Sequence, residues 1–390
     1  MRIAIVADVH VGNHRKLGGP MVNGVNQRAH YALTSLAGAL GAAEGTDCET
    51  FWVAGDLLDS ANPSPAILAR TQATLQMATM PVHLLAGNHE QVSTSAGHHS
   101  LAPLAPVVEK IWDEPDFFEG VAVFPFSPTG TSLARAFPHL DDMVKGGEVR
   151  GIIGHFGIRS PESPPWAHQS ATAVDVSSVE HPYHHCLAPG LPQHFLHCFA
   201  GDWHRHKRHQ LPRGDAVQVG ALVPTGWSDL SSRLDATDLY GSLIVWDTET
   251  GEWSRKVIPG PRFFTVPSLS DVEHWLKSEA PTSPYGYGFF RIRCDPQSFQ
   301  TLSKQAKDFE NSYMDDPHSF QGNLGGILVE IEPPPAAHLQ NLAQDVRAAD
   351  NLNGALESYV IRTAFAGEPD KKEVVERSRY FLREAGSEAG

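Results

Sequence analysis

Short apolar runs alternate with amphipathic stretches through the first half of the chain, a pattern typical of α/β folds. Asn26 precedes apolar residues at helical spacing and can cap a helix that runs to about residue 40. Ser64 followed by Pro65 indicates a second helix start, because proline suits the first helical position. The continuous apolar runs predict buried strands at 3–7, 51–54, 81–86, 151–154 and 196–200.

The pattern changes after the sequence PGP at 259–261, where we place a domain boundary. Strand-like runs at 289–293 and 326–331 flank a polar helical stretch at 297–311. We therefore expect a small α+β unit, which ends at the three prolines at 333–335.

Two amphipathic helices are predicted in the tail, at 352–360 and 371–384. Short helices of this kind cannot bury their apolar faces alone, so they must pack on a partner or on their own domain. The chain is thus expected to comprise three regions, at 1–260, 261–335 and 336–390.

Polar residues that suit metal binding follow five of the predicted strands. In open α/β sheets the carboxyl ends of the strands carry the site, so five loops would deliver these side chains to one edge. The donors are carboxylate, imidazole and amide groups without a thiolate, which suits Mn²⁺, Fe²⁺ or Zn²⁺ more than a structural zinc site. The groups are Asp8 and His10; Gly55, Asp56 and Asp59; Gly87, Asn88, His89 and Glu90; Gly154 and His155; and Gly201, Asp202 and His204.

With these motifs the sequence resembles the calcineurin-like metallophosphoesterases, and within them the Mre11/SbcD nucleases and their phage relatives. The resemblance covers residues 1–260 by motif and the remainder by layout. It implies an α/β fold in which a two-sheet sandwich is flanked by helices. A small α+β capping domain at 261–335 and C-terminal helices at 336–390 would follow.

The resemblance also implies a role for each motif residue. Asp8, His10 and His204 would hold one divalent ion, and Asn88, His155 and Asp202 would hold the other. Asp56 would bridge the two ions, while His89 would contact the phosphate or protonate the leaving oxygen. The ions implied are most often Mn²⁺, with Mg²⁺, Fe²⁺ and Zn²⁺ as alternatives. Asp59 and Glu90 are expected to support the ligands, and the glycines to allow sharp turns near the phosphate.

The last motif departs from the family pattern G-H-x-H. Either Asp202 replaces the first histidine, or His204 and His206 form the H-x-H pair after a two-residue insertion. We favour Asp202, because Gly201 and the preceding strand then stay in register. Three carboxylate ligands leave two divalent ions with one net positive charge rather than two, so we expect firm metal binding with weaker phosphate polarisation.

The implied function is that of a Mn²⁺-dependent DNA nuclease, acting as a 3′→5′ exonuclease on duplex DNA and an endonuclease on single strands or hairpins. Such a subunit would work in DNA repair or recombination as a homodimer, with residues 336–390 docking a Rad50/SbcC-like coiled-coil ATPase. The alternative is a phosphodiesterase or phosphatase that acts on nucleotides or other small phosphoesters.

Composition changes this picture in one respect. The 390 residues carry a formal charge of −15, which argues against a nucleic-acid partner. Two bound cations would reverse the sign at the site, and the window 203–213 contains four basic residues and no acidic one. We therefore expect weak DNA binding by this chain alone. The absence of a signal peptide or long apolar stretch and the four unclustered cysteines favour the cytoplasm of a bacterium or phage-infected host.

Overall fold

The computed structural model describes residues 1–332 except 16, 20, 23, 96, 130–132, 138, 160–173, 176–195, 212–213, 228–240, 279–287 and 316–323. Within this part of the chain, residues 1–263 form one compact unit, and residues 264–278 with 289–332 form a second. The helices predicted at 352–360 and 371–384 lie outside the described residues.

The first unit contains a six-stranded sheet built around β1 (Arg2–Val6), which coincides with the strand predicted at 3–7. Its neighbours are β4 on one side, parallel, and β15 on the other, antiparallel. The strand order is β16 (Trp253–Val257), β15 (Ser242–Asp247), β1 (Arg2–Val6), β4 (Thr50–Val53), β5 (Val82–Leu85) and β6 (Lys110–Trp112).

A second six-stranded sheet has a parallel centre and antiparallel edge strands. Its two central strands, β9 and β12, cover the predicted runs at 151–154 and 196–200. The order is β13 (Lys207–Leu211), β14 (Gly214–Gln218), β12 (Leu196–Gly201), β9 (Gly151–His155), β8 (Val121–Phe124) and β7 (Asp116–Phe118).

The strands are continuous apolar runs in the sequence because apolar residues pack on both faces of each central strand. In β1, Ile3 and Ile5 pack with Ile153 and Phe199 of the second sheet, whereas Ala4 belongs to the cluster on the opposite face. A strand covered on both faces carries no polar alternation. The sequence pattern therefore reflects burial on both sides.

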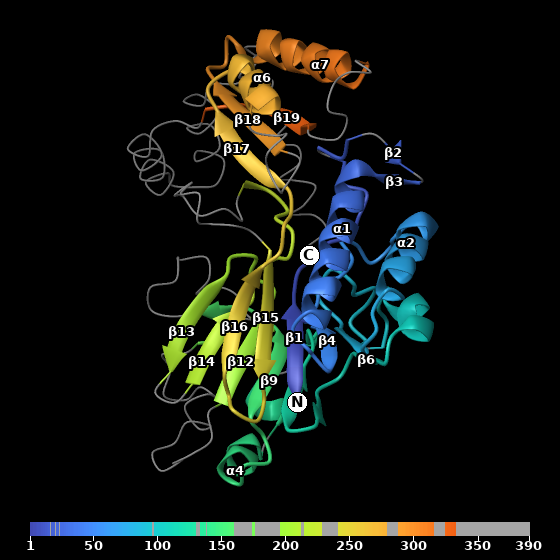
Figure 1. Ribbon diagram of the computed structural model, residues 1–390, viewed down its shortest axis with the longest axis vertical. Coiled ribbons are helices and arrows are strands. Elements are labelled where there is room, and N and C mark those ends of the chain that lie inside the picture. Colours follow the sequence, from blue (N-terminus) through green and yellow to red (C-terminus); the bar gives the residue numbers. More distant parts are fainter. Residues whose placement is uncertain are drawn as a thin grey trace, which may run out of the picture. The chain divides into compact units, whose positions relative to one another are not determined.

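Helices cover the outer faces. Figure 1 shows α1 (Gln27–Glu44) and α2 (Pro65–Leu75) side by side along the first sheet, and their apolar residues share one buried cluster with it. The second sheet packs on residues of α3 (Leu133–Ala136) and α4 (Leu140–Lys145). The predicted α/β fold with two sheets flanked by helices is thus confirmed.

Both predicted helix starts are confirmed. The Asn26 side chain accepts a hydrogen bond from the Ala29 amide at 3.0 Å, and Ser64 Oγ accepts one from the Ile67 amide at 3.3 Å. Each bond satisfies an amide that has no partner within the helix.

The second unit is a three-stranded sheet with two helices on it (Figure 1). Phe290 and Ile292 of its middle strand pack with Trp275 and Ala306 of the helices. The predicted strands at 289–293 and 326–331 and the helix at 297–311 are confirmed. The elements are β17 (Arg262–Val266), α6 (Leu269–Ser278), β18 (Gly288–Cys294), α7 (Phe299–Asp315) and β19 (Leu324–Ile331).

Short elements complete the described chain: β2 (Met21–Val22), β3 (Val25–Asn26), the 3₁₀ helix η1 (Ala102–Val107), β10 (Ile158–Arg159) and β11 (Val174–Asp175). Among the described residues, no helix combines the length and apolar character needed to cross a bilayer.

The core of the first unit contains a buried histidine on β5. His83 on β5 is 1% exposed and stacks on Trp52 with ring centroids 4.3 Å apart. Trp112 Nε1 donates to its Nδ1 at 3.4 Å, and its buried Nε2 has no hydrogen-bond partner within the described chain. Burial, with a smaller effect of Lys110, lowers the pKa of His83 to about 4.

We expect His83→Gln to reduce the loss of stability in acid. Between about pH 6.5 and 4 the unfolded wild-type chain binds a proton at this histidine that the folded chain does not, so the free energy of unfolding falls as pH falls. At about pH 5 this difference in proton binding lowers the free energy of unfolding by roughly 2 kcal/mol. Urea unfolding at pH 7 and pH 5 measures it, with the exposed His98→Gln as control. Equal pH dependence in wild type and His83→Gln would contradict the expectation.

Candidate metal centre

The five predicted motifs lie at the carboxyl ends of β1, β4 and β5 in one sheet and of β9 and β12 in the other. The loops after β1 and β4 bind each other through their backbones. The amides of Asp8, His10 and Val11 donate to the carbonyls of residues 55, 56 and 57 at 2.9–3.1 Å. Backbone hydrogen bonds alone therefore hold the loops of the first two motifs together.

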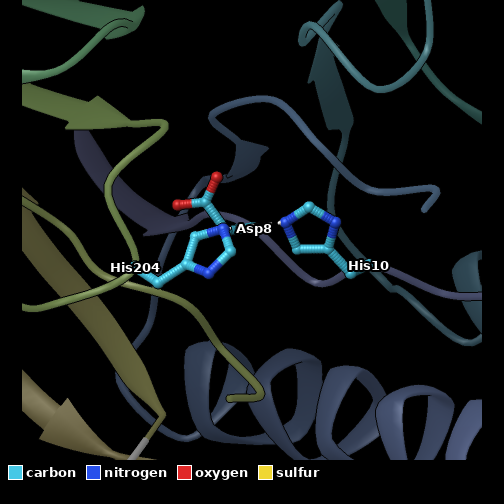
Figure 2. A group of neighbouring side chains, drawn as sticks. All are labelled: Asp8, His10 and His204. Atoms are coloured by element: carbon cyan, nitrogen blue, oxygen red, sulfur yellow. Dashed lines mark hydrogen bonds between the residues drawn. The ribbon is translucent and has the colours of Figure 1, made fainter. Parts of the chain in front are cut away.

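One group of donors comprises Asp8, His10 and His204, whose ligand atoms lie within 4.8 Å of one another. Figure 2 shows Asp8 and His10, both from the loop after β1, beside His204 from the loop after β12. The Nε2 atoms of His10 and His204 are 3.0 Å apart. Thr225 Oγ1 lies 3.2 Å from the opposite ring nitrogen of His204. The two Nε2 atoms therefore face each other, and Thr225 contacts the other side of the His204 ring.

A second group comprises Asp8, Asp56 and His155. His155 Nδ1 lies 2.8 Å from the Ala54 carbonyl oxygen, so Nδ1 is protonated, and Nε2 faces the site. That Nε2 is 2.9 Å from Asn88 Oδ1 and 3.5 Å from Asp56 Oδ2. Because Asp56 Oδ2 also lies 3.8 Å from His10 Nε2, this carboxylate stands between the two groups.

The electrostatics of the cluster fit divalent cations. Asp8 and Asp56 are 0% and 2% exposed, and burial raises the pKa of Asp8. Burial alone would lower the pKa of His155, but the carboxylates of Asp56 and Asp8 raise it well above its usual value. Buried carboxylates facing imidazole nitrogens bind cations strongly, and this donor set suits two divalent ions.

Backbone conformation marks the same residues. Seven non-glycine residues in the described chain have positive φ, and four of them are predicted ligands. Each left-handed residue of this kind costs about 1–3 kcal/mol and persists only where its surroundings enforce it. The four are Asp8 (+51°), His10 (+50°), Asp56 (+51°) and Asp202 (+94°).

Gly55 has the positive φ (+87°) of the sharp turn expected before its motif, and the glycines before the motifs also leave room for neighbouring site residues. A Cβ on Gly55 would lie 2.0 Å from the His155 ring, and one on Gly87 would lie 2.1 Å from Asp56 Oδ1. A Cβ on Gly201 would meet the Ala54 carbonyl oxygen at 2.2 Å. Neighbouring site residues thus fill the space beside these glycines.

His89 lies at the open side of the cluster. Its side chain is 41% exposed, with Nδ1 3.1 Å from the Asp59 carbonyl oxygen and Nε2 4.0 Å from Asp56 Oδ2. Its amide donates to Asp56 Oδ1 at 3.0 Å. The ring therefore faces both solvent and the predicted bridging carboxylate, and Asn88 beside it is exposed as well.

The structure places Asp202 and His206 in different surroundings. The Asp202 amide donates to both carboxylate oxygens of Asp8, at 3.0 and 3.2 Å. Burial raises the pKa of the Asp202 carboxyl, which also interacts with the charge of His155. His206 instead turns Nδ1 toward the Val219 carbonyl oxygen at 3.0 Å, and burial with Arg255 lowers its pKa to about 4.

Glu90 connects two motif loops. Its fully buried carboxylate accepts hydrogen bonds from the amides of Leu58 at 2.7 Å, Gly87 at 2.8 Å and Asp56 at 3.2 Å. Burial, with a further effect of Asp56, raises its pKa to about 8. The supporting role expected for Glu90 is thus a bond between the loops after β4 and β5.

Thr225 was not found from the sequence, because only the folded chain brings it beside His204.

The basic window at 203–213 is less positive than its sequence indicates. Arg208 forms a bidentate ion pair with Asp215, at 2.6 and 3.0 Å. Arg205 and Lys207 are exposed, whereas Arg213 lies outside the described residues. A Cβ on Gly157 would lie 2.2 Å from the Trp203 indole, so this ring packs against the backbone of its neighbour loop.

Comparison with known proteins agrees with this geometry. The family model described as calcineurin-like phosphoesterase matches residues 1–172, which contain all the predicted site residues except those after β12. Together with the two-sheet fold and the clustered donors, the match supports placing the chain in the calcineurin-like metallophosphoesterase superfamily, whose members use a dinuclear metal centre. A comparison with curated proteins gives no significant match.

Several solved structures are similar at low identity. The protein TT1561 of Thermus thermophilus is 13% identical, with a TM-score of 0.37, over 66% of this chain and 98% of that chain. Pseudomonas putida nuclease MPE is 17% identical, with a TM-score of 0.28, over 65% and 87%. A dimetal phosphatase from Danio rerio is 13% identical, with a TM-score of 0.33, over 57% and 87%.

Bound metal distinguishes the two possible ligands of the last motif. We expect Asp202→Gly to lose one of two bound Mn²⁺ ions, because glycine adopts the positive φ of this position but offers no carboxylate. His206→Ala should keep both ions. Elemental analysis after gel filtration measures the ratio of metal to protein. Loss of an ion from His206→Ala with retention in Asp202→Gly would show that His206 is the ligand.

Proposed function

We propose that this chain is a Mn²⁺-dependent DNA nuclease of the Mre11/SbcD kind. The observation that carries the proposal is the pair of overlapping donor groups, Asp8 with His10 and His204 and Asp8 with Asp56 and His155, beside a half-exposed His89. The choice of DNA rests on the motif resemblance and on the small α+β unit that follows the catalytic one.

The residues around the cluster have separate roles in phosphodiester hydrolysis. When bound, two divalent ions supply positive charge against the phosphate and activate the attacking water. Asp8 and Asp56 provide the buried negative charge that retains the ions. The Asp59 carbonyl fixes the Nδ1 proton of His89, which leaves Nε2 to carry a second proton toward a leaving oxygen.

Affinity for DNA is proposed to come mainly from a partner. The net charge is −15, and Asp215 neutralises Arg208 in the basic window. A Rad50/SbcC-like ATPase, docked through the predicted helices of 336–390, would supply most of the DNA-binding surface. We also propose that the chain works as a homodimer in the cytoplasm, in DNA repair or recombination.

A phosphodiesterase or phosphatase acting on small substrates is the second candidate. The observation in its favour is the same acidic charge, because a small phosphoester needs no basic track outside the site. Both candidates share the metal centre and differ in what lies around it.

Cleavage assays separate the two candidates. The purified chain with Mn²⁺ is incubated with end-labelled duplex DNA, a DNA hairpin and an aryl phosphodiester, with and without an SbcC-like ATPase. We expect salt-sensitive cleavage of DNA that the ATPase enhances. Cleavage of the aryl ester alone, with DNA intact even when the ATPase is present, would exclude the nuclease.

His89→Ala should cleave about 10²–10⁴-fold more slowly, because a general acid contributes about this much. Its metal content should match that of the wild type, since Asp8, His10, Asp56 and His155 remain. Elemental analysis and cleavage rate are measured on the same sample, with exposed His98→Ala as control. Loss of metal from His89→Ala would show that His89 is a ligand.

A further inference from the structure

Asp59 lies in the loop after β4 and touches three histidines. Its Oδ1 is 3.4 Å from His10 Nδ1, and its Oδ2 is 3.4 Å from His14 Nδ1. Its main-chain carbonyl oxygen is 3.1 Å from His89 Nδ1. One residue thus contacts a predicted ligand through its side chain and the predicted proton donor through its backbone.

The Asp59 carboxylate faces the buried ring nitrogen Nδ1 of His10. No described group forms a well-aligned hydrogen bond to this nitrogen, and the Asp59 carboxylate is the anion that faces it. The His10 Nε2 lies 3.0 Å from His204 Nε2 and 3.8 Å from Asp56 Oδ2. A neutral imidazole carries one proton, so a proton on Nδ1 toward Asp59 leaves the Nε2 lone pair for the cluster.

The close approach of Asp59 is built into the backbone. The Asp59 amide donates to the Val11 carbonyl oxygen at 3.2 Å, which ties the two loops together. A Cβ on Gly12 would lie 2.5 Å from Asp59 Cβ. Glycine at position 12 therefore allows Asp59 to reach the ring of His10.

We propose that the Asp59 carboxylate is a positioning residue that fixes the tautomer and the ring orientation of His10 as a metal ligand. The proposal adds a residue role to the candidate metal centre, and it rests on the proposed function only in that His10 is taken as a metal ligand. A carboxylate behind a ligating histidine raises the basicity of the ring and holds its direction. Asp59 side-chain variants should leave His89 in place, because His89 binds the main-chain carbonyl.

Metal affinity tests this role without any cleavage assay. Titration calorimetry with Mn²⁺ on the full chain should show about 10–100-fold weaker binding of one ion in Asp59→Ala. Asp59→Asn should bind with intermediate affinity, because its amide oxygen can still accept the Nδ1 proton. Asp113→Ala is the matched control, since it removes a carboxylate 3.5 Å from His99 Nε2 outside the cluster, and it should match the wild type.

Histidine tautomers give a second readout. In ¹⁵N-histidine spectra of the metal-free chain, recorded at a pH at which the ring is neutral and assigned with His10→Gln, the His10 ring should be the Nδ1-protonated tautomer in wild type and a tautomer mixture in Asp59→Ala. Affinity within twofold of wild type for Asp59→Ala, with an unchanged tautomer, would overturn the proposal.

Loss of a whole ion from both Asp59→Ala and Asp59→Asn would also overturn it, because Asp59 would then be a ligand. Its carboxylate forms a third donor group with His10 and His89, whose ligand atoms lie within 4.8 Å of one another. If Asp59→Ala does not fold, Asp59→Asn supplies both readouts. Since no nucleic acid is used, failure here leaves the nuclease proposal standing, and failure of the DNA assays leaves this one standing.

Discussion

The burial of two carboxylates where the sheets meet is the constraint on which this structure depends. Asp8 and Asp56 are almost fully removed from solvent, and burying an unpaired anion costs too much for a protein to tolerate. Imidazoles from the loops of both sheets and two backbone amides offset this cost. The Asp202 amide donates to Asp8, and the His89 amide donates to Asp56. Loops from five strands are therefore organised around two negative side chains.

Much of this arrangement could be predicted from the sequence because two local signals report it. Continuous apolar runs mark strands covered on both faces, and polar residues just after them mark the carboxyl edge. The runs at 3–7 and 51–54 and the cap at Asn26 needed no tertiary information. The predicted ligands Asp8, His10 and His155 could be named because each follows such a run directly.

Other parts depend on contacts that no local pattern carries. The strand β15 is an apolar run like the others, but its pairing with β1 across some 240 residues follows from no local pattern, and β16 is a largely exposed, charged edge strand. Spacing alone left Asp202 and His206 open as alternative ligands, because only the fold shows that the Asp202 amide contacts Asp8 whereas His206 Nδ1 lies 3.0 Å from the Val219 carbonyl oxygen. Thr225 supports His204 from a loop that only the folded chain brings near.

The pairing of β1 with β15 has a consequence for synthesis of the chain. Ala4 and Ile5 of β1 pair with residues 245 and 244 of β15, and Asp8 follows β1 directly. A nascent chain lacks this partner strand until residue 247 has left the ribosome, so an apolar strand edge stays open while most of the first unit is translated. The six-stranded sheet of the first unit can therefore be completed only after most of that unit has been synthesised.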